Sequence, residues 1–203
     1  MGMENISRNS GAGNKRRRPD FFTRFRRNDK GSVAVEFSIL ILPFTLLTFA
    51  ILETCISFAA QTVMINATDD IARQFRTGQL QPGHTEAEKQ ELRDTIFTQI
   101  CGRMEVIVSK GCPGLLIDLR SFDHFSQAAS YRFTIVEDKI VLQPGNIREE
   151  DFAIEPGPTM SRNILRVFYK WPIITDFMSR YIASLDGGKT LHFASFVWQN
   201  EPF

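Results

Sequence analysis

Cysteine, tryptophan and tyrosine are scarce in this sequence, with three, two and three among its 203 residues. So few cysteines exclude a small scaffold built on several disulfides. Long apolar runs are scarce too, since there is one, near the N-terminus, and this excludes a protein with several membrane spans. The net charge is also small, because 24 basic and 23 acidic residues leave only +1.

This near-zero charge is a cancellation between two parts of the chain. Residues 1–31 hold nine basic and three acidic residues, a balance of +6. Residues 32–203 hold fifteen basic and twenty acidic residues, a balance of -5. Such an asymmetry indicates a terminal segment with a role of its own.

The uncharged run predicts a membrane span. Residues 37–52 carry no charge, and the run continues to residue 60 with a single carboxylate, Glu53. About 20 helical residues cross the roughly 30 Å hydrocarbon core of a bilayer. A core helix of a soluble domain is amphipathic, whereas this run is apolar on all sides, and Pro43 inside it is tolerated in a membrane helix. We predict one transmembrane helix over residues 32–60.

The flanking charges predict the orientation of this helix. Eight of the nine basic residues of the leader lie within residues 15–30, whereas residues 61–71 hold two acidic residues and no basic one. By the positive-inside rule, residues 1–31 form a basic cytoplasmic leader, and residues 61–203 lie on the outer side of the membrane. The basic run at residues 15–18 also fits a nuclear-localisation or nucleic-acid patch, but beside a span this is the weaker interpretation, and we expect no nucleic-acid partner.

Glu36 is an anomaly, because it is a carboxylate at the cytoplasmic mouth of the span. An ionisable group inside a membrane costs about 2.5–3.5 kcal/mol, so a function with a specific partner is the default hypothesis. If a peptidase cut after Gly31, Ser32 would become the new N-terminus and Glu36 the fifth residue. The new amine would be largely protonated at neutral pH and would pair with this carboxylate, within one chain or between neighbouring subunits.

The basic leader, Gly31, the Glu at the fifth mature position and the apolar helix together resemble type IV prepilin-like proteins. The stretch GSVAVEFSILILPFTLLTFAILET is similar to TadE-like pseudopilins of the tight-adherence (Tad, Flp pilus) system, as are AQTVMINATDDIARQFRTGQL and RVFYKWPI. The resemblance covers mainly residues 31–80, with a second patch at 166–173. The chain is much longer than the major Flp pilins, and Phe37 stands where these usually have Tyr. Both departures favour a minor pseudopilin.

The resemblance implies a function, a location and partners. A prepilin peptidase would cleave between Gly31 and Ser32, and Glu36 would set the registration of neighbouring subunits. The protein would be needed for assembly of Flp-type pili, anchored by one span in the bacterial inner membrane with its C-terminal domain in the periplasm. Its partners would be the prepilin peptidase, other pilins and pseudopilins, and the membrane assembly platform of the Tad system.

Beyond the span, the pattern changes from helices to strands. An amphipathic continuation over 61–77 and a capping box at Thr85 and Glu88 predict two helices, the second reaching residue 103. Several strands then follow without βαβ alternation, which predicts an α+β fold with an antiparallel sheet, in a pilin-like layout. The continuation has one apolar stripe, Met64, Ala67, Ile71 and Phe75. The predicted strands are 115–122, 131–136, 139–143, 164–171 and 191–198, with a hairpin turn at 137–138 and a short helix at 176–184.

Two of the three cysteines, Cys101 and Cys112, fall in the outer domain, where an oxidising periplasm permits a disulfide. Metal ligation is the alternative, but the sequence has no Cys-x-x-Cys and its histidines are scattered singly. We therefore predict the disulfide and expect no metal and no cofactor.

Enzyme motifs are missing, among them a Gly-rich phosphate loop, Gly-x-Ser-x-Gly and His-Glu-x-x-His. Asp118, Asp123 and His124 are close in sequence, but a solvated turn is the commoner origin of such a group. We expect no catalytic residues and no small-molecule substrate. Three alternatives remain: an unprocessed bitopic adhesin or envelope factor, a protein released by signal peptidase after residue 60, and a periplasmic enzyme on a membrane tether.

Overall fold

The computed structural model describes residues 32–202. Helix α2 (Ser32–Arg76) comes first and continues through Pro43, and α3 (Glu86–Met104) follows. The chain divides into two compact units between residues 47 and 48, so the division falls inside α2 and the remaining elements all belong to the second unit. These elements are β1 (Leu115–Phe122), α4 (Phe125–Ala128), β2 (Arg132–Val136), β3 (Lys139–Gln143), β4 (Ile147–Arg148), η2 (Glu149–Asp151), β5 (Ile154–Glu155), β6 (Arg162–Pro172), α5 (Asp176–Ile182) and β7 (Lys189–Gln199).

Helix α3 begins at the predicted capping box. The Thr85 hydroxyl accepts the backbone N–H of Glu88 at 3.2 Å, and the Glu88 carboxylate accepts the backbone N–H of Thr85 at 3.1 Å. Each contact satisfies an N–H group that the first helical turn leaves without an intrahelical partner. The predicted start of this helix is confirmed.

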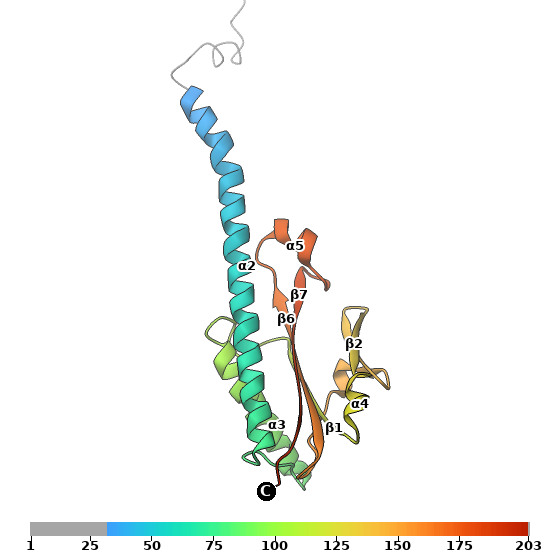
Figure 1. Cartoon of the computed structure of the whole chain (residues 1–203). Coiled ribbons are helices and arrows are strands. Elements are labelled where there is room, and N and C mark those ends of the chain that lie inside the picture. Colours follow the sequence, from blue (N-terminus) through green and yellow to red (C-terminus); the bar gives the residue numbers. More distant parts are fainter. Residues whose placement is uncertain (1–31, 203) are drawn as a thin grey trace, which may run out of the picture. The chain divides into compact units, whose positions relative to one another are not determined.

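The larger sheet has the strand order β5-β1-β6-β7. Strands β1 and β7 both pair antiparallel with the long central strand β6, whereas the two-residue β5 pairs parallel with β1. One face of this sheet lies on α3 and on the part of α2 after residue 48 (Figure 1). Alternate residues of β6 point to opposite faces, so Leu165 and Val167 enter the core against the helices while Phe168 faces away from them.

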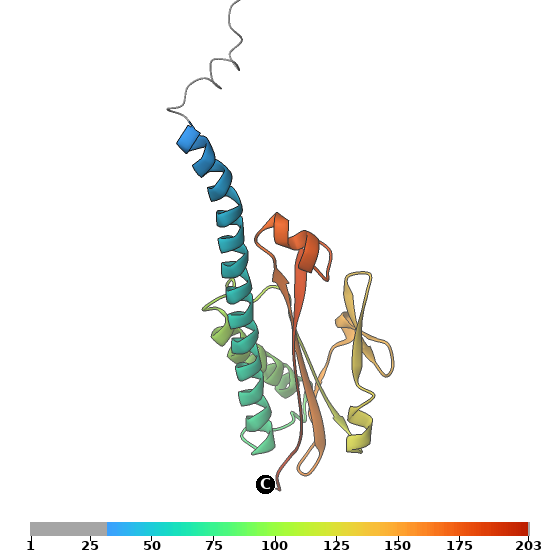
Figure 2. The same ribbon diagram turned by 45° about the horizontal axis from the view of Figure 1, so that its top comes forward.

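A smaller sheet, β2-β3-β4, covers the other face of β6 and β7. Both views place it on the side of these strands opposite α2 (Figures 1 and 2). Its buried residues Ile140 and Leu142 form a second core with Phe168, bordered by further aromatic rings. The β2–β3 turn at Glu137 and Asp138 has φ values of 51° and 63°, the left-handed conformation that two-residue hairpin turns need.

The α+β class, the second helix and the antiparallel strands agree with the prediction. One detail is different, because the strands form two sheets rather than one. The β2–β3 hairpin lays its apolar residues on the face of β6 instead of extending an edge of the larger sheet. Strand β5 was not predicted, since a two-residue strand leaves no alternating pattern in the sequence.

Candidate functional site

The first part of α2, Val33–Leu52, carries apolar side chains around its whole circumference, with Glu36 as its one charged residue. Its large side chains are exposed on every side, as lipid hydrocarbon permits and water does not. The helix is long and apolar enough to cross a membrane, and it is therefore a candidate span. The exposed large residues are Val33, Val35, Phe37, Ile39, Leu40, Leu42, Phe44, Leu46, Leu47, Phe49, Ile51 and Leu52.

The predicted processing and registration residues lie at the start of this helix. Gly31 is outside the described residues, and Ser32 is the first residue of α2. Glu36 has an exposed side chain one turn later. Positions 32 and 36 are four apart in a helix and share one face, so the helix puts both residues where the predicted amine–carboxylate pair requires them. Cleavage at Gly31 and pairing at Glu36 stay predictions.

After Leu52, α2 carries a ladder of three polar side chains spaced four residues apart, Glu53, Ser57 and Gln61. The Glu53 carboxylate accepts backbone N–H groups from the segment after β6 and, at 2.5 Å, the Thr175 hydroxyl. The Ser57 hydroxyl lies 2.9 Å from His192 Nε2, and the Gln61 amide donates to the Phe193 carbonyl at 2.7 Å. This polar ladder fastens α2 to the end of β6 and to β7.

Beyond the polar ladder, the predicted apolar stripe is buried. Met64, Ala67, Ile71 and Phe75 are almost fully buried against α3 and the larger sheet. Phe75 lies with its ring centroid 6.2 Å from that of Trp198 on β7. The second part of α2 is therefore one layer of the second compact unit, which corresponds to the predicted outer domain.

A comparison with protein families identifies this helix. Residues 31–73 match the family model of TadE-like proteins. This segment of the chain is TadE-like. The match confirms the resemblance to TadE-like proteins over residues 31–73, and the similarity at 166–173 stays a prediction. No curated protein and no solved structure matches the chain.

The TadE-like segment thus starts at Gly31 and includes Glu36, the candidate span, the polar ladder and most of the apolar stripe. The polar ladder was missed by sequence reasoning because Glu53 was counted as one tolerated charge inside a longer span. Its signal was present, since three polar residues at a spacing of four mark one helix face.

His192, the partner of Ser57 in the TadE-like segment, is a buried residue of β7. Its ring stacks on Trp171, with centroids 5.3 Å apart, and its Nδ1 atom has no hydrogen-bond partner among the described residues. Burial lowers the pKa of His192 from 6.5 to about 4, because the charged imidazolium would lose its water here. His192 is therefore neutral at neutral pH.

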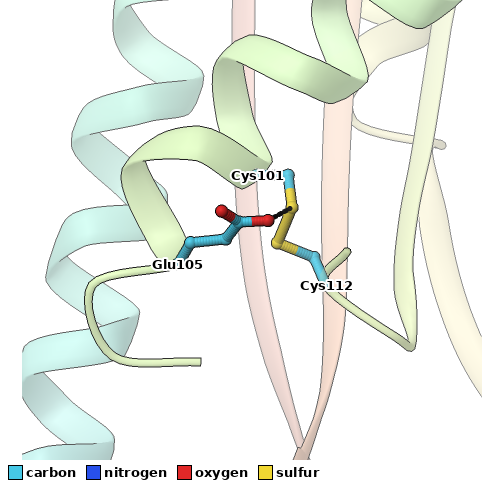
Figure 3. A group of neighbouring side chains, drawn as sticks. All are labelled: Cys101, Glu105 and Cys112. Carbon is cyan, nitrogen blue, oxygen red and sulfur yellow. Dashed lines mark hydrogen bonds between the residues drawn. A yellow bond between two sulfur atoms is a disulfide. The ribbon is translucent and has the colours of Figure 1, made fainter. Parts of the chain in front are cut away.

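The predicted disulfide between Cys101 and Cys112 is present and joins the end of α3 to the chain just before β1. Glu105 lies beside it, 3.6 Å from the Cys101 sulfur (Figure 3). The Glu105 carboxylate also accepts the backbone N–H of Gly111 at 2.9 Å. The three side chains are close enough to hold a metal ion. With their sulfurs bonded to each other, however, the cysteines offer no thiolate ligands.

Asp118, one of the three residues weighed as a catalytic group, is a buried structural residue. Its carboxylate forms ion pairs with Arg166 at 2.6 Å and with Arg120 at 2.9 Å. Asp118 and Arg166 are opposite each other on β1 and β6, so the pair joins these two strands. Asp123 and His124 come after β1 and are exposed.

Proposed function

We propose that this chain is a minor pseudopilin needed for the assembly of Flp-type, tight-adherence pili. The observation that carries the proposal is the TadE-like match, which starts at Gly31 in the sequence and covers a helix that begins at Ser32 and has Glu36 four residues further on. The match supports the pilus system, and the spacing supports processing and registration within it.

In this proposal a prepilin peptidase cuts between Gly31 and Ser32 and removes the basic leader. The new amine is mostly protonated at neutral pH, since an α-amino group has a pKa of about 8. When pseudopilin helices associate in the membrane, the Glu36 carboxylate of one subunit pairs with the amine of its neighbour. The pairing offsets the cost of a carboxylate inside the membrane and fixes the axial position of the two helices.

The outer domain acts through contacts and not through catalysis. It is held outside the inner membrane, where it binds other pilins, pseudopilins or the assembly platform. Asp118 supports this part of the proposal. It is the most buried of the three residues considered as a catalytic group, and its carboxylate forms ion pairs with two arginines.

N-terminal sequencing of the protein extracted from membranes tests processing. We expect the mature chain to start at Ser32, and Gly31→Asp to leave the leader attached. A wild-type chain that still starts at Met1 in cells with an active prepilin peptidase would refute the processing step. It would favour the unprocessed envelope factor with the same topology.

Glu36→Gln tests registration, because it removes the charge and keeps the size of the side chain. We expect loss of pili in electron micrographs, with unchanged amounts of protein in the membrane fraction. Ser38→Ala is the matched control, since the Ser38 hydroxyl is also exposed but bonds to its own helix at Ala34. Normal pili in the Glu36→Gln strain would remove the role assigned to Glu36.

A further inference from the structure

The segment between β6 and β7, residues 173–183, is fastened to α2 through Glu53. The buried Glu53 carboxylate accepts the backbone N–H groups of Ile174 and Thr175 and the Thr175 hydroxyl. Figure 1 shows α5, which lies within this segment, beside α2. The segment therefore lies at the level of residue 53 along the helix.

Residue 53 is also where α2 stops being exposed on all sides, because one face is buried from Glu53 onward while Ile56 and Phe58 stay exposed on the other. Val33–Leu52 comprises twenty residues, which span about 30 Å as a helix, the thickness of the hydrocarbon core. The next residue is the buried Glu53, and Ala60 and Met64 are buried further along. If the span fills the membrane from Val33, the outer hydrocarbon boundary falls at Leu52, next to the segment that Glu53 holds.

The side chains that this segment exposes suit such a place. Ile174 is 71% exposed, Tyr181 75% and Ile182 45%, and Arg180, next to Tyr181, is exposed as well. Exposed isoleucines gain free energy by leaving water, and Tyr and Arg are favoured at the headgroup level of a bilayer. Lipid is the apolar partner within reach of these side chains. The part of α2 that would lie in the membrane ends at Leu52, directly before Glu53.

We propose that residues 173–183 rest on the outer leaflet of the membrane, with Ile174 and Ile182 in the acyl–headgroup boundary, held there by Glu53. The proposal shortens the span from the predicted residues 32–60 to 33–52 and assigns residues 53–60 to the outer domain. It rests on the proposed membrane span of α2, but on no step of pilus assembly. The domain would then have two attachments to the membrane, a helix through it and a loop upon it, which restrict its tilt.

Spin labels on the full-length protein in phosphatidylethanolamine–phosphatidylglycerol vesicles test this. The background variant is Cys55→Ala, because Cys55 is exposed, while Cys101 and Cys112 are protected from labelling by their disulfide. A nitroxide is attached at Ile182→Cys or Ile174→Cys, and its collisions with oxygen, which enriches in lipid, are compared with those of a water-soluble nickel chelate. We expect the ratio of oxygen to nickel collisions to be several-fold higher at these two positions than at an aqueous site.

Two positions on the same chain calibrate the measurement. Met160→Cys is the aqueous control, because Met160 is also exposed, at 53%, and lies in the turn that contacts Glu201, itself bonded to Arg76. Arg76 is 23 residues beyond Glu53 on α2, about 35 Å along the helix. Leu46→Cys is the lipid control inside the span.

The outcomes separate the two proposals. Ratios at 174 and 182 equal to that at 160, with a lipid-like ratio at 46, would overturn the resting segment and leave the span in place. A water-like ratio at 46 would overturn the span itself. A third outcome would assign this surface to a protein partner and overturn the resting segment. In that case the ratios at 174 and 182 are water-like in pure lipid, and both positions are protected from both reagents in native membranes that contain pilus components.

Discussion

The two parts of α2, on either side of Glu53, share one helix and similar apolar residues but differ in what covers them. In Val33–Leu52 the large side chains are exposed on all sides, whereas the part from Glu53 to Arg76 buries one face. Apolar content alone does not distinguish these environments. Spacing does, since the second part combines a polar ladder with an apolar stripe, and the first part has neither.

The difference teaches how a single helix serves two surroundings. Lipid solvates any apolar side chain and needs no complementary shape, and the uniform first part suits such a surrounding. The outer domain needs a matched surface, so the second part places each buried residue at helical spacing. Substitutions matched between the two parts should therefore have different effects on the outer domain.

The largest difference is expected for phenylalanine. Phe75→Ala removes a side chain that is 1% exposed, and we expect it to lower the free energy of unfolding by about 3–5 kcal/mol. Phe49→Ala, at a residue 59% exposed, should leave the domain unchanged. Denaturant unfolding in detergent, followed by the fluorescence of Trp171 and Trp198, measures both. Equal effects would break the distinction between the two parts.

Cysteine gives the next comparison. Replacing Cys101 and Cys112 together by Ser opens a loop with a sequence separation of 11 and should destabilise the domain by about 3 kcal/mol. Cys55→Ser, on the exposed side of α2, should have no effect on the same unfolding curve. A domain that keeps full stability without the disulfide would show that α3 is held by packing alone.

The contact between the polar ladder and β7 should depend on pH. Unfolded His192 takes up a proton near its ordinary pKa of 6.5, while the folded residue resists protonation down to about pH 4. Between these values the unfolded chain binds more protons, so stability falls as the pH falls, by up to about 3 kcal/mol in all. Between pH 7 and pH 4, the free energy of unfolding should change less with pH in His192→Gln than in the wild-type protein. Identical slopes would show that the folded site accepts the proton.

The smallest effect is expected for threonine. Thr68 is fully buried and Thr45 is in the candidate span, and each hydroxyl donates to a backbone carbonyl of its own helix. Thr68→Val should cost the domain about 1 kcal/mol or less, because the substitution removes one hydrogen bond and keeps the shape. Thr45→Val should cost it nothing. Thermal unfolding in detergent distinguishes the two, and a larger loss at Thr45 would contradict the comparison.

Much of the fold could be predicted because its signals are local. The stripe through Met64 and Ile71, the capping box at Thr85 and the strand 115–122 each follow from residue spacing within one element. The pairing of β5 with β1 and the packing of the second sheet on Phe168 could not be predicted, because both depend on contacts between residues distant in the sequence.

The candidate site divides in the same way. The TadE-like character of the helix was readable from Gly31, Glu36 and the uncharged run. The partners of Glu53, Ser57 and Gln61 lie more than 100 residues away in the chain, at residues 174, 192 and 193. A polar residue in an apolar helix indicates a hydrogen-bond partner, but the residues next to it in the sequence do not show which residue that partner is.

The hydroxyl groups of the candidate span have a mechanical consequence. Ser38 and Thr45 each donate to a carbonyl one turn earlier in α2, so these two donors are already paired within the helix. Two such helices lying side by side would therefore contact each other through apolar surfaces, with few hydrogen bonds between them. Sliding one along the other would meet little resistance until a carboxylate left its partner. If Glu36 pairs with a neighbouring amine as proposed, that one ion pair per subunit would supply most of the resistance to axial slip in a bundle of such helices.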